Sequence, residues 1–206
     1  MNSGKVIGFD IDGVLADFVG PASQLLHELY EIRPRSSGSQ LTWHFPITEE
    51  QEQTMWEAID ATNGRFWRHL KPLVTDSELD EMWALERDGY AFCYVTSRHR
   101  KARQATMEWL VEQQFPIGKL HMVKDKASYL SQQLPSALDE LDLAGFLDDS
   151  PQHARELAAR GLPNYIRDFP YNRGMGVPGI RVSSVGEYLF LVTGGETPRL
   201  SVMHND

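Results

Sequence analysis

The chain has 206 residues, with 20 Lys and Arg against 29 Asp and Glu, so its formal net charge is −9. With 41% hydrophobic and 24% charged residues it has the composition of a globular protein, and its length predicts one domain with at most an inserted subdomain. The single Cys93 excludes an intramolecular disulfide framework, and the acidic balance argues against a nucleic-acid partner, since such binding needs Lys and Arg to neutralise phosphates.

Membrane insertion and secretion are not expected either. No run approaches the roughly 20 apolar residues of a membrane span. The N-terminus has no basic region, long apolar stretch or small-residue cleavage site. The expected location is therefore the cytoplasm, with no membrane partner.

Four short apolar runs, each followed by polar residues, predict strands buried in a parallel sheet. They cover residues 5–9, 90–95, 120–123 and 143–147. Strands that alternate with helices indicate an α/β fold. The expected architecture is a Rossmann-like three-layer sandwich with a mainly parallel sheet.

Helical periodicity fills the segments between these runs. Apolar residues recur at helical spacing over 22–30, from Leu79 onward, and over 102–110. Thr75 and Glu78 have the spacing of a capping box before the second of these helices. A fourth helix is expected to start at Ser150-Pro151 and to end at Gly161.

The stretch between the first two strands is far longer than one crossover helix needs. It contains a segment rich in Pro, Ser and Gly at 33–46 and a further helix-like run around Met55 and Ile59. We interpret residues 17–71 as a small helical cap inserted after the first strand. The core domain would then comprise residues 1–16 and 72–193, and residues 194–206 would form a C-terminal tail.

Polar side chains follow each predicted strand, at the edge where open parallel sheets bind ligands. In chain order the pairs are Asp10 and Asp12, Thr96 and Ser97, Lys124 and Lys126, and Asp148 and Asp149. Clustered carboxylates need a cation, and oxygen ligands select a hard ion such as Mg²⁺. A hydroxyl, a lysine and backbone N–H groups at helix starts form an anion site. The combination predicts a phosphate beside Mg²⁺, with one aspartate available to attack phosphorus.

Each pair also has a purely structural interpretation. Asp10 and Asp12 could belong to a turn, and Ser97 could cap the next helix. The acidic pair at 148–149 could complement a helix dipole, and the lysines could be solvated. Four different features at the ends of four apolar runs favour a joint functional role.

At these residues the sequence resembles the haloacid dehalogenase superfamily of phosphatases. Its four motifs correspond to residues 9–15, 95–96, a lysine, and 147–149. The run Asp-Ile-Asp-Gly-Val-Leu-Ala-Asp-Phe at 10–18, with Trp43, residues 66–73, Thr96-Ser97 and Lys124-Asp125-Lys126, is similar to the 5'(3')-deoxyribonucleotidases. This resemblance covers most of residues 5–170. It implies a hydrolase that removes phosphate from nucleoside monophosphates beneath a small helical cap.

The resemblance also implies catalytic roles. Asp10 would be the nucleophile that forms an aspartyl-phosphate. Asp12 would protonate the leaving alcohol and then deprotonate the attacking water. Mg²⁺ would be held by the carboxylates of Asp10 and Asp148 and by the backbone carbonyl of Asp12.

The remaining motif residues would handle the phosphate. Thr96 would bind its oxygens, with Ser97 as a further candidate. Lys126 would offset the charge on Asp10 and the phosphate, and Lys124 would be a secondary contact. Asp149 would orient the lysine or the metal-bound waters.

Two departures from the animal relatives lie close to the predicted phosphate site. Thr-Ser-Pro is replaced by Thr96-Ser97-Arg98, and Asp-Asp-Arg by Asp148-Asp149-Ser150. They put the substrate preference in question, whereas the residues of the core chemistry are kept. For a nucleotide substrate, Phe18 and Trp43 are candidates to stack on the base, and Trp67 is expected in the core of the cap.

The most favoured function is a Mg²⁺-dependent 5'-nucleotidase that acts on small phosphorylated substrates, above all deoxynucleoside monophosphates. One alternative is a phosphatase for another small metabolite or for a nucleic-acid terminus. A second alternative is a catalytically silent module that binds a partner. That alternative is weakened because Asp10, Asp12, Lys126 and Asp148 are all present. The sequence leaves the oligomeric state open.

Overall fold

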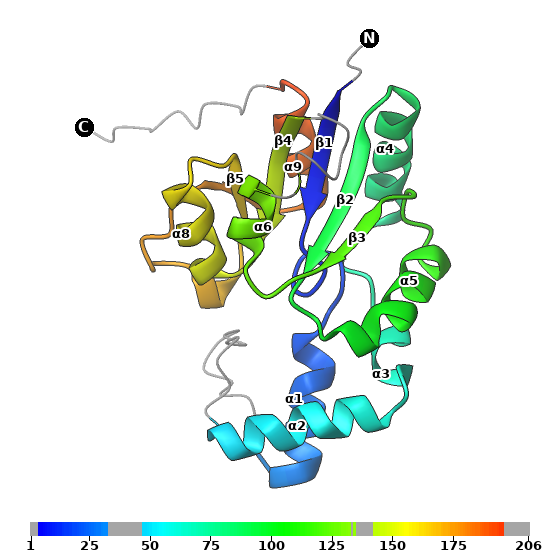
Figure 1. Ribbon diagram of the computed structural model, residues 1–206, viewed down its shortest axis with the longest axis vertical. Coiled ribbons are helices and arrows are strands. Elements are labelled where there is room, and N and C mark those ends of the chain that lie inside the picture. Colours follow the sequence, from blue (N-terminus) through cyan, green and yellow to red (C-terminus); the bar gives the residue numbers. More distant parts are fainter. Residues whose placement is uncertain (1–3, 33–46, 133, 135–141, 196–206) are drawn as a thin grey trace, which may run out of the picture.

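The structure is a computed structural model that describes residues 4–32, 47–132, 134 and 142–195. A six-stranded sheet in the order β3-β2-β1-β4-β5-β6 forms its centre (Figure 1), and all five neighbouring pairs are parallel. The strands are β1 (Lys5–Phe9), β2 (Ala91–Thr96), β3 (Lys119–Met122), β4 (Asp142–Asp148), β5 (Asn164–Arg167) and β6 (Ile180–Val182). The predicted α/β fold with a parallel sheet is confirmed.

Strands β5 and β6 are additions to the four predicted strands. They have only four and three residues, and β5 carries Asn164 and Arg167 although it is buried throughout. The side-chain amide nitrogen of Asn164 donates to the carbonyls of Ala154 and Pro178, and the Arg167 guanidinium donates to those of Val14 and Leu73. Short strands with polar ends produce no apolar run that a sequence pattern could reveal.

Helices cover both faces of the sheet and form a further group beyond its carboxyl edge (Figure 1). They are α1 (Val19–Tyr30), α2 (Glu49–Ala61), α3 (Arg65–Arg68), α4 (Asp76–Arg87), α5 (Arg103–Glu112), α6 (Lys126–Gln132), α8 (Pro151–Ala159) and α9 (Val185–Val192), with 3₁₀ turns η1 (Arg100–Ala102) and η2 (Pro170–Asn172). The predicted caps are present: Thr75 and Glu78 form a capping box before α4, and Ser150 caps α8.

Alternation along the strands divides the core into two layers. Ile7 and Phe9 on β1 belong to one hydrophobic cluster with α4, α5 and α9, whereas Val6 belongs to a second cluster with Ala127 on α6 and Leu157 on α8. Figure 1 shows α4 and α5 on one side of the sheet and α6 and α8 on the other. The expected three layers are therefore observed.

Helices α1, α2 and α3 lie between β1 and β2 in the chain and beyond the carboxyl ends of the strands (Figure 1). The predicted cap after the first strand is thus present. The chain enters and leaves it side by side, because Ala16 and Pro72 form an antiparallel bridge and Leu73 N–H donates to the Leu15 carbonyl at 2.8 Å. The domain limits at 17–71 remain a prediction. In the predicted tail, residues 196–206 lie outside the described residues.

Among the residues that the structure describes, every helix is too short or too polar to cross a bilayer.

Candidate active site

Asp10, Lys126 and Asp148 meet at the carboxyl edge of the sheet. Asp10 follows β1, Asp148 ends the neighbouring β4, and Lys126 begins α6 after β3. The Lys126 ammonium lies 2.7 Å from Asp10 Oδ2 and 2.9 Å from Asp148 Oδ2. All three residues are buried, and Lys126 is only 1% exposed. The sheet therefore brings together residues from three different predicted motifs.

The electrostatics of this cluster favour an additional cation. Burial raises the pKa of Asp10 to about 8, although Lys126 opposes the shift. Burial would also raise the pKa of Asp148, but Lys126 and His153 outweigh it and hold that pKa well below its usual range. Burial would lower the pKa of Lys126, but the two carboxylates raise it. The single lysine therefore does not fully compensate the negative charge of Asp10.

The raised pKa of Asp10 predicts a pH dependence of stability in the metal-free protein. Between the ordinary value of 3.8 and about 8, folded Asp10 keeps a proton that the unfolded chain has released. The contribution of Asp10 to the free energy of unfolding should therefore decrease as pH rises through this window, and level off above it. Melting temperatures in a chelator, from about pH 5 to about pH 9, measure this trend. Asp10→Asn should remove the decrease in stability with rising pH. If the melting temperature of this variant still fell with pH as in the unaltered protein, Asp10 would not be the group responsible.

Asp12 lies next to this cluster and is held by Arg98. The guanidinium donates from Nε to Asp12 Oδ2 at 2.8 Å and from Nη2 to Asp12 Oδ1 at 2.6 Å. Thr96, at the end of β2, is 1% exposed, and its hydroxyl accepts the Arg98 backbone N–H at 3.2 Å. Arg98 was noted in the sequence only as a departure from relatives, and its role as the partner of Asp12 was missed.

Asp149 supports the loop that carries Asp10 and Asp12. It is fully buried, accepts a short hydrogen bond from the Tyr171 hydroxyl, and packs against Gly13. The side-chain amide of Asn172 donates to the Asp149 carbonyl at 2.9 Å. Tyr171 and Asn172 lie in η2, a turn that no motif singled out.

Gly13 provides a test of this packing. Its φ is +77°, and a Cβ at this position would overlap the Asp149 carboxylate. Gly13→Ala should lower the free energy of unfolding by about 1–3 kcal/mol from the backbone alone, and further through the overlap. Gly161→Ala is the matched control, because its φ is +68° and no atom lies within 4 Å of its Cβ position. Thermal denaturation compares the stabilities of the two variants. Equal losses in the free energy of unfolding would show that the contact with Asp149 is unimportant.

The possible metal donors include a residue that the sequence analysis did not single out. Ligand atoms of Asp10, Asp148 and His153 all lie within 4.8 Å of one another. His153 Nδ1 is 3.1 Å from Asp148 Oδ2, and its side chain is 20% exposed. Since His153 lies in the first turn of α8, directly after β4, its spacing from Asp148 is the signal that could have revealed it.

Three predicted substrate contacts, Ser97, Lys124 and Phe18, are not part of the buried cluster. Ser97 and Lys124 are exposed, so the lysine that reaches Asp10 is Lys126. Phe18 is 2% exposed and stacks with Trp56 and Trp67 at ring-centroid distances of 5.7 and 5.9 Å. This packing makes Phe18 part of the cap core and disfavours its predicted stacking on a base. Trp43 lies outside the described residues.

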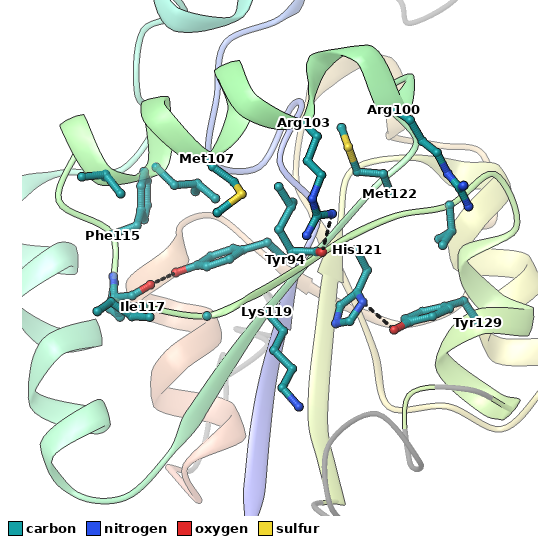
Figure 2. A pocket seen from close by; sticks show the side chains of 16 residues that line it. Tyr94, Arg100, Arg103, Met107, Phe115, Ile117, Lys119, His121, Met122 and Tyr129 are labelled. Atoms are coloured by element: carbon teal, nitrogen blue, oxygen red, sulfur yellow. Dashed lines mark hydrogen bonds between the residues drawn. The ribbon is translucent and has the colours of Figure 1, made fainter.

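A separate cavity of about 770 Å³ runs along β3, one of the two edge strands of the sheet (Figure 2). Tyr94, Met107 and Ile117 line its apolar part. Arg103, labelled in Figure 2, also lines the cavity and donates to the Leu120 carbonyl at 3.1 Å. None of the predicted catalytic or metal-binding residues lines this cavity. It is therefore distinct from the candidate active site.

Comparisons with known proteins give one matching family and several related sequences. Residues 4–192 match the family model described as "5' nucleotidase, deoxy (Pyrimidine), cytosolic type C protein". A Bacillus cereus protein named "Putative nucleotidase" is 24% identical over 182 residues, which cover 84% of this chain and 91% of the relative. A Chlorobaculum tepidum protein named "Putative 5'(3')-deoxyribonucleotidase" is 24% identical over 166 residues, covering 76% of this chain and 75% of that protein.

Solved structures share the fold at low sequence identity. A haloacid dehalogenase-like hydrolase from Streptococcus pneumoniae matches with a TM-score of 0.65 and 12% identity, covering 92% of this chain and 98% of that one. A structure titled as a predicted phosphoglycolate phosphatase from Haemophilus somnus matches with a TM-score of 0.63 and 14% identity, covering 93% and 98%. At these identities the likeness establishes the fold alone.

Proposed function

This chain belongs to the cytosolic type C family of deoxy (pyrimidine) 5' nucleotidases, hydrolases of the haloacid dehalogenase superfamily, and from this premise we propose that it releases phosphate from deoxynucleoside monophosphates through an aspartyl-phosphate. The observation that carries the proposal is the buried bridge from Lys126 to Asp10 and Asp148. The cap helices beyond the strand ends are consistent with a small substrate. The word cytosolic in the family description supports a cytoplasmic location.

The donor set fits a divalent cation. Two buried carboxylates with one lysine between them leave negative charge to be compensated, and carboxylate oxygens suit Mg²⁺. Asp10 and Asp148 would hold the ion, with the Asp12 backbone carbonyl, and the His153 nitrogen lies in the same cluster. When bound, the ion would neutralise charge on the phosphoryl oxygens.

The side chains divide the reaction into two steps. In the first, an Asp10 oxygen attacks phosphorus, the bond from phosphorus to the nucleoside oxygen breaks, and Asp12 gives that oxygen a proton. In the second, Asp12 takes a proton from water as the water attacks the phosphorylated Asp10, which releases inorganic phosphate. Lys126 and the Thr96 hydroxyl would compensate charge on the transferred group throughout both steps.

A substrate panel tests this function. We expect a deoxynucleoside 5'-monophosphate to be hydrolysed with a higher kcat/KM than glycerol phosphate or a 3'-phosphorylated oligonucleotide. A base stacked on an aromatic side chain contributes roughly 1–3 kcal/mol, which corresponds to a preference of about 5- to 150-fold. Trp43→Ala should reduce the preference for the nucleotide over glycerol phosphate, mainly by lowering kcat/KM for the nucleotide. Activity should disappear in a chelator and return with Mg²⁺.

The panel also separates the alternatives. If the oligonucleotide were the best substrate, the terminal-phosphate alternative would replace this proposal. Equal rates on all small phosphates would leave a general phosphatase without a nucleotide preference. A folded, metal-loaded protein that turns over none of them would favour a partner-binding role.

A further inference from the structure

The cavity along β3 carries positive charge, although the net charge of the chain is −9. None of the 16 described residues that line it is acidic, whereas Arg100, Arg103 and Lys119 are basic. Arg100 and Arg103 take part in none of the salt bridges between described residues. Burial lowers the pKa of His121, and the charges of Lys119 and Arg103 lower it further. An anion is therefore the complementary charge for this cavity.

The same cavity gathers exposed apolar side chains. Met107 and Val111 on α5 and Ile117 before β3 line it, and they are 48%, 74% and 85% exposed. Ile117 and Val111 are the two most exposed large hydrophobic residues in the part of the chain that the structure describes. In the view of Figure 2, Met107, Phe115 and Ile117 lie on one side of Arg103. Apolar surface gathered next to a few polar groups is typical of a ligand-binding site.

Several observations argue for a small molecule as the occupant. A strand that paired with β3 would need free backbone groups along this edge, but Arg103 already donates to the Leu120 carbonyl. A second copy packed symmetrically on the cavity would bring the arginines of both copies together, with no acidic residue of the lining between them. The cavity volume of about 770 Å³ lies within the range of roughly 300–1,000 Å³ that is typical of small-molecule sites.

The polar groups of the lining determine the chemistry of this molecule. The Tyr94 hydroxyl donates to the Pro116 carbonyl at 2.8 Å, and the Tyr129 hydroxyl is hydrogen-bonded to His121 Nδ1 at 2.5 Å. Because these groups are engaged within the protein, the body of the ligand must be mainly apolar. The two arginines, in contrast, keep N–H donors that suit a carboxylate or a sulfonate.

We propose that this cavity binds a small amphipathic anion, with its apolar body against Met107 and Ile117 and its anionic group beside Arg100 and Arg103. An aliphatic or aromatic carboxylate has this chemistry. None of the predicted catalytic or metal-binding residues lines the cavity, so the inference does not depend on the proposed function. Its experiment is a binding measurement and needs no turnover of a substrate.

The fluorescent dye anilinonaphthalene sulfonate is a suitable probe, because it joins an aromatic body to a sulfonate. We expect saturable binding of one dye molecule to each folded chain. Octanoate should displace the dye at concentrations at least about tenfold lower than octylammonium, which has a similar body but the opposite charge. Acetate has the charge of octanoate without the apolar body, and it should not displace the dye.

Two variants test the two halves of the site. The double variant Arg100→Gln and Arg103→Gln removes the charge beside the anionic group and should weaken dye binding by about tenfold. Met107→Glu places a carboxylate one helical turn from Arg103, at the apolar end of the cavity, and should weaken binding by at least about tenfold. The fold should survive this change, because Met107 is exposed and glutamate is a good helix former.

The chain offers a matched control for each variant. Phe190→Glu also places a carboxylate at a helical residue that is 48% exposed, but outside the cavity. Arg87→Gln removes an exposed arginine at the end of α4, which does not line the cavity either. Both controls should bind the dye like the unaltered protein. Thermal unfolding shows whether each variant is folded.

Several results would overturn the inference. The first is an absence of saturable dye binding, and the second is equal displacement by octanoate and octylammonium. Unchanged dye binding in the cavity variants would place the dye elsewhere on the molecule. A dimer in analytical ultracentrifugation that Met107→Glu dissociates would assign the surface to a second copy. Sedimentation with phosphatidylserine vesicles that the same variant abolishes would assign it to a membrane surface.

Discussion

Replacing Asp10 by Asn should reduce phosphate release by at least about 10⁴-fold, because an amide cannot attack phosphorus and removal of a nucleophile leaves only residual catalysis. The fold should survive, since Lys126 keeps its partner Asp148 at 2.9 Å. Release of inorganic phosphate from a deoxynucleoside monophosphate measures the loss, and thermal unfolding confirms that the variant is folded. In the unaltered protein, beryllium fluoride should inhibit, because it imitates a phosphorylated aspartate.

Asp125→Asn is the matched control for this variant. Asp125 is exposed one residue before Lys126, and its carboxylate accepts the Ser128 backbone N–H at 2.8 Å. Because asparagine caps helices about as well as aspartate, this variant should keep both its activity and its stability. Substantial turnover by folded Asp10→Asn protein would refute the assignment of the nucleophile. Equal losses in the two variants would show that the effect is not specific to the buried position.

The central cluster was predictable because it follows from topology. In a parallel sheet the carboxyl ends of the strands share one edge, so Asp10, Lys126 and Asp148 could be expected to converge without knowledge of the strand order. The alternation of apolar runs and helices was sufficient for this expectation, and the capping residues Thr75 and Ser150 fixed where two of the helices begin.

The direction of individual side chains was not predictable in the same way. Arg98 follows Thr96 closely, and its sequence position marks it only as a departure from relatives close to the predicted phosphate site. In the structure its side chain is turned inward, toward Asp12, and Thr106 and Trp67 complete its surroundings. Those two residues come from a core helix and from the cap, and their meeting point depends on how the cap is seated. The residues close to Arg98 in the sequence therefore do not predict that contact.

The contacts of aromatic residues are also difficult to predict from the sequence. Phe18 has the same apolar ring whether it stacks on a base or on another side chain. Its contacts with Trp56 and Trp67 arise because α2 and α3 return to the beginning of α1. His153 is different, because its spacing from Asp148 places it in the first helical turn after a strand end. Side chains of a first turn point back toward the strand end, so this residue could have been identified from sequence.

Lys126→Met should cause the largest loss of stability, because it leaves Asp10 and Asp148 buried without their shared cation. Methionine has a similar length but no charge, and breaking a buried ion pair by removing one partner costs about 3–5 kcal/mol. For a chain of this size that corresponds to a fall in melting temperature of roughly 6–20 °C. Because Lys126 lowers the pKa of Asp10, its removal raises that pKa above about 8. The loss should therefore become smaller as pH falls toward about 8, because Asp10 of the variant then takes up a proton that relieves the repulsion between the carboxylates.

The matched control is Lys124→Met, two residues earlier on the exposed side of the same loop. A surface substitution of this kind should change the free energy of unfolding by no more than about 0.5 kcal/mol. Mg²⁺ should raise the melting temperature of Lys126→Met, because a dication bound by Asp10 and Asp148 supplies the charge that the variant lacks and stabilises the folded state through binding. If the two variants melt alike in a chelator, then Lys126 is not what balances the two carboxylates. The electrostatic basis of the proposed site would then be wrong, even though the three side chains lie together.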